Sequence, residues 1–369
     1  MKLALRELLR RPGRFVTATG ILTLIAVLLM FLGGLLDGLL GLATGAVRAQ
    51  QADAIVFSPA SQASFLRSRI DVDVRRDVEA TEGVREVGGL GVVLLGARVP
   101  GNGPRDLANV AVWGYELAPR GVPAPPEPGQ VYADRTLEAD GVELGDELAV
   151  GPARSPLTVV GWVQDTAYNG QGGLWADLST WRRVLGENRP DSVLAEGVVQ
   201  ALVVRGVEPG GEVVAAVERQ MGDRAVVLSV DDAVEAIPGV TEQRTTFNQI
   251  LGVTVTIALV VIGLFFALLT VERSALYGML KAIGARSRTI FAGLVVQAVV
   301  VTGVAAAIAG VAVVVLDRVI PAGSIPLAVS PGRIALSTGL LLVAAVAGCA
   351  FSLRRVLRVD PASALGGGS

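Results

Sequence analysis

Side chains that commonly carry out catalysis are scarce in this sequence. Its 369 residues include no histidine and one cysteine, Cys349. This composition excludes histidine-based catalytic triads, zinc sites built from histidine or cysteine, and any disulfide within one chain. The two lysines, Lys2 and Lys281, do not follow a GxxxxGK[ST] phosphate-binding loop, so the chain is not a P-loop ATPase by itself.

The elements that must position the remaining polar residues are unusually apolar. The chain is 51% apolar and 18% charged, with a mean hydropathy of +0.56, whereas soluble domains carry about a quarter charged residues. A membrane-spanning helix needs about 20 apolar residues. Four segments meet this length, at residues 15–36, 251–271, 290–316 and 334–353. We therefore expect four transmembrane α-helices.

Two of these segments have another interpretation. The first could be a signal peptide, but its apolar run of roughly 20 residues is longer than the usual 7–15-residue core of such peptides. The last could be a buried helix of a soluble protein. Arg333 and Arg354 at its two ends favour a membrane span, because charges that flank a clean apolar run are typical of one.

Charged residues predict the orientation of the chain. The N-terminus, the 272–289 loop and the tail from Arg354 together carry twelve Lys and Arg residues against three acids. Cytoplasmic loops are enriched in Lys and Arg, so these pieces and both termini are expected inside. Residues 48–248 carry 18 Arg against 29 Asp and Glu, which suits an external domain.

The long segment between the first two spans has a mixed pattern of strands and helices, which predicts one α+β domain. Four prolines between Gly121 and Gly129 predict an extended loop. Residues 165–170 follow a strand and predict a tight turn, with a functional role for Tyr168 as the alternative. Strands are predicted at 92–95, 109–112, 157–163, 201–205 and 225–230, and helices at 72–80, 178–185 and 211–221.

The expected organisation of the chain follows from these spans. It comprises a cytoplasmic amphipathic N-terminal helix (1–14), a first transmembrane helix with its extension (15–47), a large extracellular α+β domain (48–248), a second transmembrane helix (249–271), a cytoplasmic coupling loop (272–289), a third transmembrane helix (290–316), an outer loop (317–333), a fourth transmembrane helix (334–353) and a cytoplasmic tail (354–369).

The cytoplasmic loop is the most specific piece of the sequence. Its 274–283 segment is short and amphipathic, ends on Gly284, and precedes Arg286 and Arg288. Such a helix with a glycine cap predicts a contact with a cytoplasmic partner. The same loop could also be an ordinary positively charged inner loop.

This loop resembles the coupling segment of ABC transporter permeases of the FtsX/MacB type. In that family a Glu-Arg pair leads into a short helix that ends in Leu-Lys/Arg-Ala-Ile-Gly-Ala, and a closing Asp-Pro-x-x-Ala pattern corresponds to the tail from Asp360. The layout of one span, a large external domain and three spans agrees over essentially the whole chain. The family's coupling positions correspond here to Glu272, Arg273, Leu276, Met279, Leu280, Lys281, Ile283, Gly284 and Arg286.

The resemblance implies a function without catalysis in this chain. It implies a homodimeric permease of the bacterial cell membrane that pairs with two copies of a separate cytoplasmic ABC ATPase, embedded in lipid and not bound to nucleic acid. ATP binding would move the coupling loops, and rigid helices would transmit that movement across the membrane. The cargo would be a hydrophobic or amphiphilic compound.

Residues 31–35, 165–168 and 278–284 are most similar to the haem-exporting branch of the family. Haem would be the cargo, with no intrinsic cofactor. Iron in haem proteins is held by His, Cys, Met or Tyr, so Met30 is the candidate ligand within the membrane and Tyr168 a candidate external contact. A laterally open pocket between the spans of two chains would be lined by Met30, Phe31, Gly34, Leu35, Asp37, Phe247, Leu251 and Val255.

Alternatives to this site and function stay open. A methionine in an apolar helix commonly fills space, a Gly-Gly pair in a span commonly marks a helix contact, and Asp37 could be an interfacial residue. A second function is that of FtsX-like permeases, which move nothing and regulate a cell-wall hydrolase. An enzyme embedded in the membrane has no support, since no predicted span carries paired carboxylates or a metal-ligand spacing.

Overall fold

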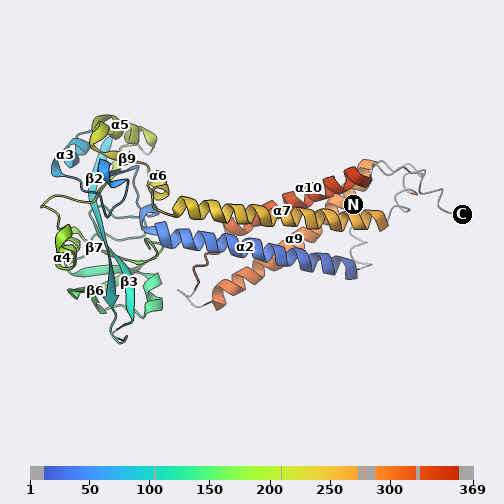
Figure 1. The fold of residues 1–369 in the computed structure, drawn as a ribbon, viewed down its shortest axis with the longest axis horizontal. Coiled ribbons are helices and arrows are strands. Elements are labelled where there is room, and N and C mark those ends of the chain that lie inside the picture. The colour runs from blue at the N-terminus through green and yellow to red at the C-terminus, as the bar shows by residue number, and fades with distance from the viewer. Residues whose placement is uncertain are drawn as a thin grey trace. The chain divides into compact units, whose positions relative to one another are not determined.

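The fold was obtained as a computed structural model, which describes residues 12–103, 105–208, 210–272, 279, 287–320 and 325–356. The chain divides into two compact units (Figure 1). The helical unit contains α2 up to Asp37, α7 from Thr245, and helices α9 and α10. The second unit, which we call the sheet domain, is the chain from Gly38 to Arg244 together with residues 325–326.

Within the described residues, four helices are long and apolar enough to cross a membrane. They are α2 (Pro12–Arg48), α7 (Val240–Glu272), α9 (Ser287–Val319) and α10 (Pro331–Val356). They confirm the predicted fold class of four apolar helices with an α+β domain between the first and the second.

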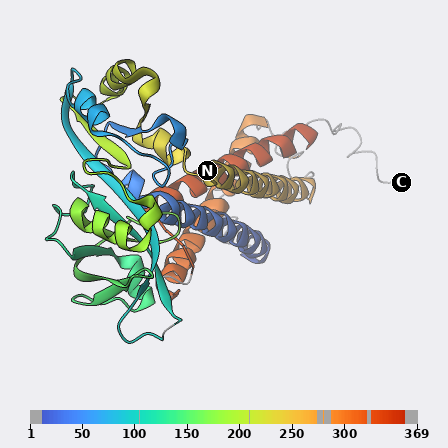
Figure 2. The same ribbon diagram turned by 60° about the vertical axis from the view of Figure 1, so that its left-hand side comes forward.

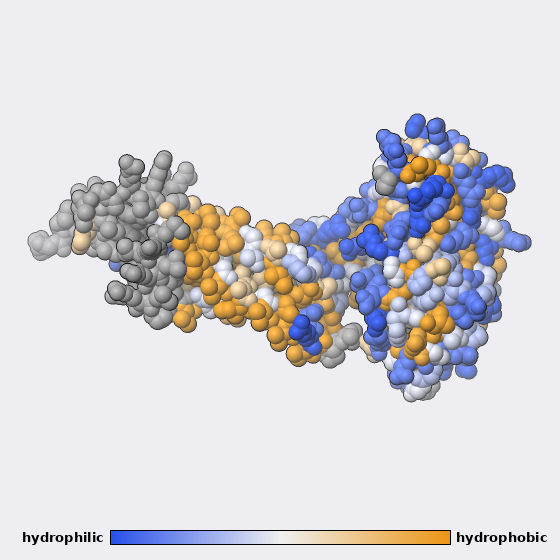
Figure 3. Space-filling model, turned by 180° about the vertical axis from the view of Figure 1, so that it is seen from behind, coloured by the Kyte–Doolittle hydropathy of each residue, from blue (hydrophilic) through white to orange (hydrophobic). Residues whose placement is uncertain are grey.

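The helices of the helical unit pack through small side chains and leave large apolar ones outside. Ala26, Ala258 and Ala309 are completely buried in one cluster of the bundle. Leu24, Leu264 and Val311 remain at least 65% exposed. The surface of the helices is accordingly dominated by hydrophobic residues (Figure 3). This distribution suits helices surrounded by lipid, where no water drives large apolar groups inward.

The sheet domain has the α+β composition that the sequence predicts. Its nine strands are β1 (Ala54–Phe57), β2 (Val84–Arg98), β3 (Leu107–Tyr115), β4 (Gln130–Asp134), β5 (Glu147–Val150), β6 (Ser155–Val163), β7 (Gly172–Asp177), β8 (Ala201–Gly206) and β9 (Val226–Leu228). Its α-helices are α3 (Val72–Glu79), α4 (Leu178–Asn188), α5 (Gly211–Met221) and α6 (Val230–Glu235), with short 3-10 helices at Pro59–Ser61, Arg135–Asp140, Pro190–Ser192 and Gly222–Arg224.

Strand β2 joins two parts of the sheet (Figure 2). Its first half pairs with β8, which continues through β1 to β9. Its second half pairs with β3 on one side, and its last residues pair with β5 on the other. The order β2-β3-β7-β4-β6-β5 then closes on itself through these pairings. Closure removes free strand edges, so this part of the sheet has few unpaired backbone groups.

An aromatic cluster fills the core beneath β1, β3 and β7. Trp113 and Trp175 stack with ring centroids 5.3 Å apart. Phe65 packs edge-to-face against Phe57 and Trp113, with ring centroids 4.9 and 5.4 Å apart. Edge-to-face and offset stacked pairs add stabilisation beyond the area that they bury. All four tryptophans of the sequence lie in the sheet domain, so tryptophan fluorescence reports on this domain alone.

We expect Phe65→Ala to lower the free energy of unfolding of the sheet domain by about 3–5 kcal/mol, because it leaves a cavity among rings that cannot close around it. Urea unfolding of the full-length protein in detergent, followed by tryptophan fluorescence, measures this. Leu66→Ala is the control, since Leu66 is 43% exposed and should cost no more than about 0.5 kcal/mol. Equal effects of the two variants would contradict the assignment of Phe65 to the core.

Candidate functional site

Most of the predicted coupling positions lie outside the described residues. These are Arg273, Leu276, Leu280, Lys281, Ile283, Gly284 and Arg286. Glu272 is the last residue of α7, and Met279 is 62% exposed. Most of the predicted N-terminal helix 1–14 and of the tail 354–369 also lie outside the described part of the chain.

Met30 lies inside the helical unit. Its side chain is 1% exposed and belongs to a cluster with Leu29, Ala258 and Ala309. Leu251 and Val255, two other residues of the predicted pocket, pack against this cluster. The structure therefore brings these three predicted residues together, but it places the methionine sulfur where it fills space between helices.

The remaining apolar pocket residues stay partly accessible. Phe31 and Leu35 on α2 and Phe247 on α7 are half-buried, as are Leu251 and Val255. Each of these five side chains is therefore more accessible than the Met30 side chain, which is 1% exposed.

The two glycines of α2 are contact points for the start of α10 and the segment before it. A Cβ atom at Gly33 would lie 2.7 Å from the Arg333 side chain, and one at Gly34 would lie 2.9 Å from Leu327. The Ala328 N–H donates a hydrogen bond to the Gly34 carbonyl at 3.0 Å. Of the two uses predicted for this glycine pair, the structure shows the close helix contact.

Asp37 forms an ion pair with Arg333 across the same contact. The Arg333 Nε–H donates to Asp37 Oδ2 at 2.7 Å, and its Nη2 contacts the other carboxylate oxygen. The side chains of Arg333 and Asp37 are 18% and 31% exposed. A two-point guanidinium–carboxylate pair fixes orientation as well as charge. Both oxygens of the Asp37 carboxylate are therefore paired with Arg333 of α10 in this structure.

Tyr168 belongs to the aromatic core of the sheet domain. It is 6% exposed. Its ring packs edge-to-face against Trp113 and Phe65, with ring centroids 5.1 and 6.0 Å apart. Burial raises the pKa of the Tyr168 phenol to about 12. A buried, protonated phenol is a poor iron ligand at neutral pH, which argues against the predicted external haem contact.

The turn that carries Tyr168 is attached to α2. We call residues 165–170 the docking turn, because it meets the last turns of the helix within the sheet domain. Asp165 and Asn169 hold positive φ angles of 56° and 51°, a conformation that Asp and Asn tolerate better than most residues. Three backbone hydrogen bonds make the attachment: Ala46 N–H to Ala167 O at 3.0 Å, Asn169 N–H to Ala43 O at 3.0 Å, and Gly170 N–H to Leu42 O at 3.1 Å.

Gly45 makes this close approach possible. A Cβ atom at this position would lie 2.6 Å from the Asp165 carbonyl oxygen, well inside van der Waals contact. Asp134 holds the turn from the other side, since its buried carboxylate accepts hydrogen bonds from the Thr166 N–H and hydroxyl at 2.7 and 2.6 Å. The turn, the helix and β4 are thus one connected piece of structure.

No group of three His, Cys, Asp or Glu residues that could hold a metal ion occurs in the described ranges. Cys349 is buried among the bundle residues Ala345 and Phe266. The predicted site residues therefore pack between helices, form an ion pair or attach α2 to the sheet domain. The sequence predicts the tight turn at residues 165–170, which the structure confirms, but it predicts neither the attachment of that turn to α2 nor the Asp37–Arg333 pair.

We expect Gly45→Val to detach the docking turn. Loss of three backbone hydrogen bonds at about 1 kcal/mol each would lower the free energy of unfolding by about 3 kcal/mol. Hydrogen exchange should show lost protection of the Asn169 and Gly170 amides. Gly41→Val is the matched control, because a Cβ atom at Gly41 meets nothing within 4 Å. Unchanged exchange in Gly45→Val would show that the turn does not need this helix contact.

We expect a double-mutant cycle of Asp37→Asn and Arg333→Gln to give a coupling energy of about 1–3 kcal/mol, because the two partly buried charges interact directly. SDS unfolding followed by far-UV circular dichroism measures the helical unit. The exchanged pair Asp37→Arg with Arg333→Asp should recover part of the loss. Additive single effects would mean that the pair contributes no specific stability.

Comparison with known proteins agrees with this architecture. The family model described as FtsX-like permease C-terminal matches residues 248–361. An uncharacterized ABC transporter permease of Mycobacterium tuberculosis is 29% identical over 376 residues, covering 99% of both chains. A protein named for a hemin transport system, the permease HrtB of Staphylococcus epidermidis, is 20% identical over 368 residues and all of both chains.

Among solved structures, the periplasmic region of MacB from Actinobacillus actinomycetemcomitans covers 52% of this chain and 96% of its own, with 12% identity. Its TM-score of 0.35 is too low to support a conclusion. Residues 248–361 thus match the C-terminal region of FtsX-like permeases, and the chain as a whole is similar to ABC transporter permeases.

Proposed function

We propose that this chain is the permease subunit of an efflux transporter that exports haem, or a similar hydrophobic amphiphile, from the membrane. It works as a homodimer with two copies of a cytoplasmic ATPase. It lies in the bacterial plasma membrane with both termini in the cytoplasm and the sheet domain outside. The name of the HrtB relative supports this choice of cargo.

The attachment of the docking turn to α2 is the observation that carries this proposal. α2 is one helix from Pro12 to Arg48, and its last turns are hydrogen bonded to the sheet domain through Leu42, Ala43 and Ala46. A helix transmits axial movement well, because each turn is hydrogen bonded to the next. Movement of α2, set off when the ATPases close on the 272–289 loops, would therefore reach the docking turn. ATP chemistry stays in the partner.

The cargo contacts the accessible apolar side chains and not the glycine pair. Leu327 and Arg333 already occupy the space beside Gly33 and Gly34. Phe31, Leu35, Phe247, Leu251 and Val255 are half-buried and form the proposed cargo surface. With Met30 and Tyr168 both buried, the macrocycle is held by its apolar faces and not through its iron.

A titration of the purified permease with haemin, followed by visible absorbance, tests this proposal. We expect a saturable shift of the Soret band in the wild type. The double variant Phe31→Trp with Leu35→Trp should bind haemin about tenfold more weakly, since added bulk in a fitted surface costs about 1–3 kcal/mol. The control is Leu24→Trp, because Leu24 lies on the same helix and is 72% exposed. Met30→Ala and Tyr168→Phe should leave the shift unchanged.

Other results would correct the proposal in defined ways. A shift that disappears in Met30→Ala would restore Met30 as the axial ligand. Equal affinity of the double variant and the wild type would move the cargo surface elsewhere. No shift above the detergent background would overturn haem as the cargo. Cell chaining in a deletion strain, without sensitivity to haem, would then favour the FtsX-like regulation of a cell-wall hydrolase.

A further inference from the structure

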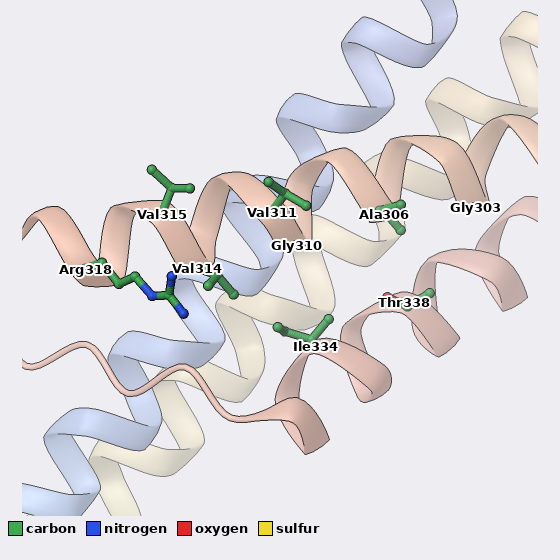
Figure 4. Close-up of a pocket in the computed structure, with 10 residues that line it drawn as sticks. Gly303, Ala306, Gly310, Val311, Val314, Val315, Arg318, Ile334 and Thr338 are labelled. Atoms are coloured by element: carbon green, nitrogen blue, oxygen red, sulfur yellow. The ribbon is translucent and has the colours of Figure 1, made fainter.

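A groove runs between α9 and α10 in the helical unit (Figure 4). Its volume is about 510 Å³. Along α9 it is lined by Gly303, Ala306, Ala307 and Gly310, and α10 contributes Ile334 and Thr338. The groove exists because small residues leave space between two helices whose larger side chains would otherwise close it. Its lining is almost entirely apolar.

The groove has a buried floor and an exposed rim. Ala306 and Gly310 are buried, and Ala306 belongs to the cluster around Met30, whereas Ala307 is exposed and Val311 and Val315 beside it are 67% and 54% exposed. In a membrane permease such a surface meets hydrocarbon. Lipid chains must fill it, because an empty apolar groove loses dispersion contacts on both sides.

One cation lies at the end of this groove. Arg318 is exposed and lines it one turn beyond Val314, with its guanidinium turned back along α9 (Figure 4). Arg318 forms no ion pair with any residue in the described ranges. Its neighbour Asp317 does not compensate it, since adjacent residues on a helix do not face each other. A long arginine side chain near the end of a membrane helix extends to the headgroup region of the bilayer.

We propose that this groove binds an anionic phospholipid, with one acyl chain along Gly303 to Gly310 and the phosphate paired with Arg318. Charge complementarity selects an anionic headgroup over a zwitterionic one. This inference goes beyond the proposed export function and depends only on the membrane location of the helices.

Native mass spectrometry of the full-length permease in detergent, titrated with phosphatidylglycerol or phosphatidylcholine, tests this. We expect tighter binding of phosphatidylglycerol to the wild type. Arg318→Gln should weaken that binding about fivefold, as expected for loss of one cation near a lipid headgroup, and should weaken phosphatidylcholine less, because choline offsets the charge of its phosphate. Arg318→Lys should retain the preference.

Gly303→Leu tests the apolar part of the groove. A Cβ atom at Gly303 meets nothing within 4 Å, so leucine fills the groove without a clash, and both lipids should bind at least about fivefold more weakly. Gly339→Leu is the matched control, because Gly339 is an exposed α10 residue that also has open space and does not line the groove.

Unchanged lipid binding in Arg318→Gln or in Gly303→Leu would overturn the proposal. Haemin that displaces phosphatidylglycerol from the wild type but not from Gly303→Leu would assign the groove to the cargo instead.

Discussion

Helix α2 is one continuous helix that belongs to two different parts of the protein, the apolar helical unit and the sheet domain. Up to Asp37 it belongs to a bundle of apolar helices, where each backbone polar group must find its partner inside the protein. From Gly38 it belongs to a sheet domain, where the docking turn reaches its backbone at Leu42, Ala43 and Ala46. The docking turn can reach the α2 backbone only where the side chains on that face of the helix are small. The small residues Ala43, Gly45 and Ala46 and the positive φ angles of the turn follow from this requirement.

A related requirement governs the helical unit. Helices in lipid gain nothing from excluding water, so they associate by close packing of small residues and by polar contacts. A Cβ atom at Gly348 of α10 would lie 2.9 Å from the Leu259 carbonyl of α7, and Ala26, Ala258 and Ala309 are buried in the cluster around Met30. Met30 is unbranched and adapts to the irregular space that such small neighbours leave. The Asp37–Arg333 pair supplies a directional contact where α10 begins.

The sequence predicts the parts of this structure that depend on local pattern. Long apolar runs with charged ends predict the four helices, and the strands and helices predicted between residues 72 and 230 are confirmed in β2, β3, β6, β8, β9, α3, α4 and α5. Strand β2 is far longer than its predicted core at 92–95, because its first half is defined by pairing with β8. Strand β7 begins with two glycines, and glycine weakens any strand signal.

The predicted pocket shows the same limit. The family resemblance and the glycine-rich first span predict a pocket lined by Phe31, Leu35, Leu251 and Val255. They do not predict that Arg333, 296 residues from Asp37, supplies the partner of that carboxylate. Nor does a turn pattern at 165–170 reveal that Tyr168 points into an aromatic core, because that direction is set by α2 and by Asp134. Contacts between distant segments depend on packing that no local pattern encodes.

Under the proposed function, the buried positions of Met30 and Tyr168 also determine how strongly the cargo can be held. Inside lipid, apolar contacts replace other apolar contacts, so half-buried residues such as Phe31 and Phe247 add little affinity compared with the same surface in water. An axial ligand would add a strong bond and slow release, because differences in affinity among related complexes appear mainly in the dissociation rate. A permease that must release its cargo in each cycle is better served by shape and by weak contacts. The ATP-driven movement of α2 then supplies the direction of transport, and the cargo surface only has to admit a flat amphiphile from the bilayer.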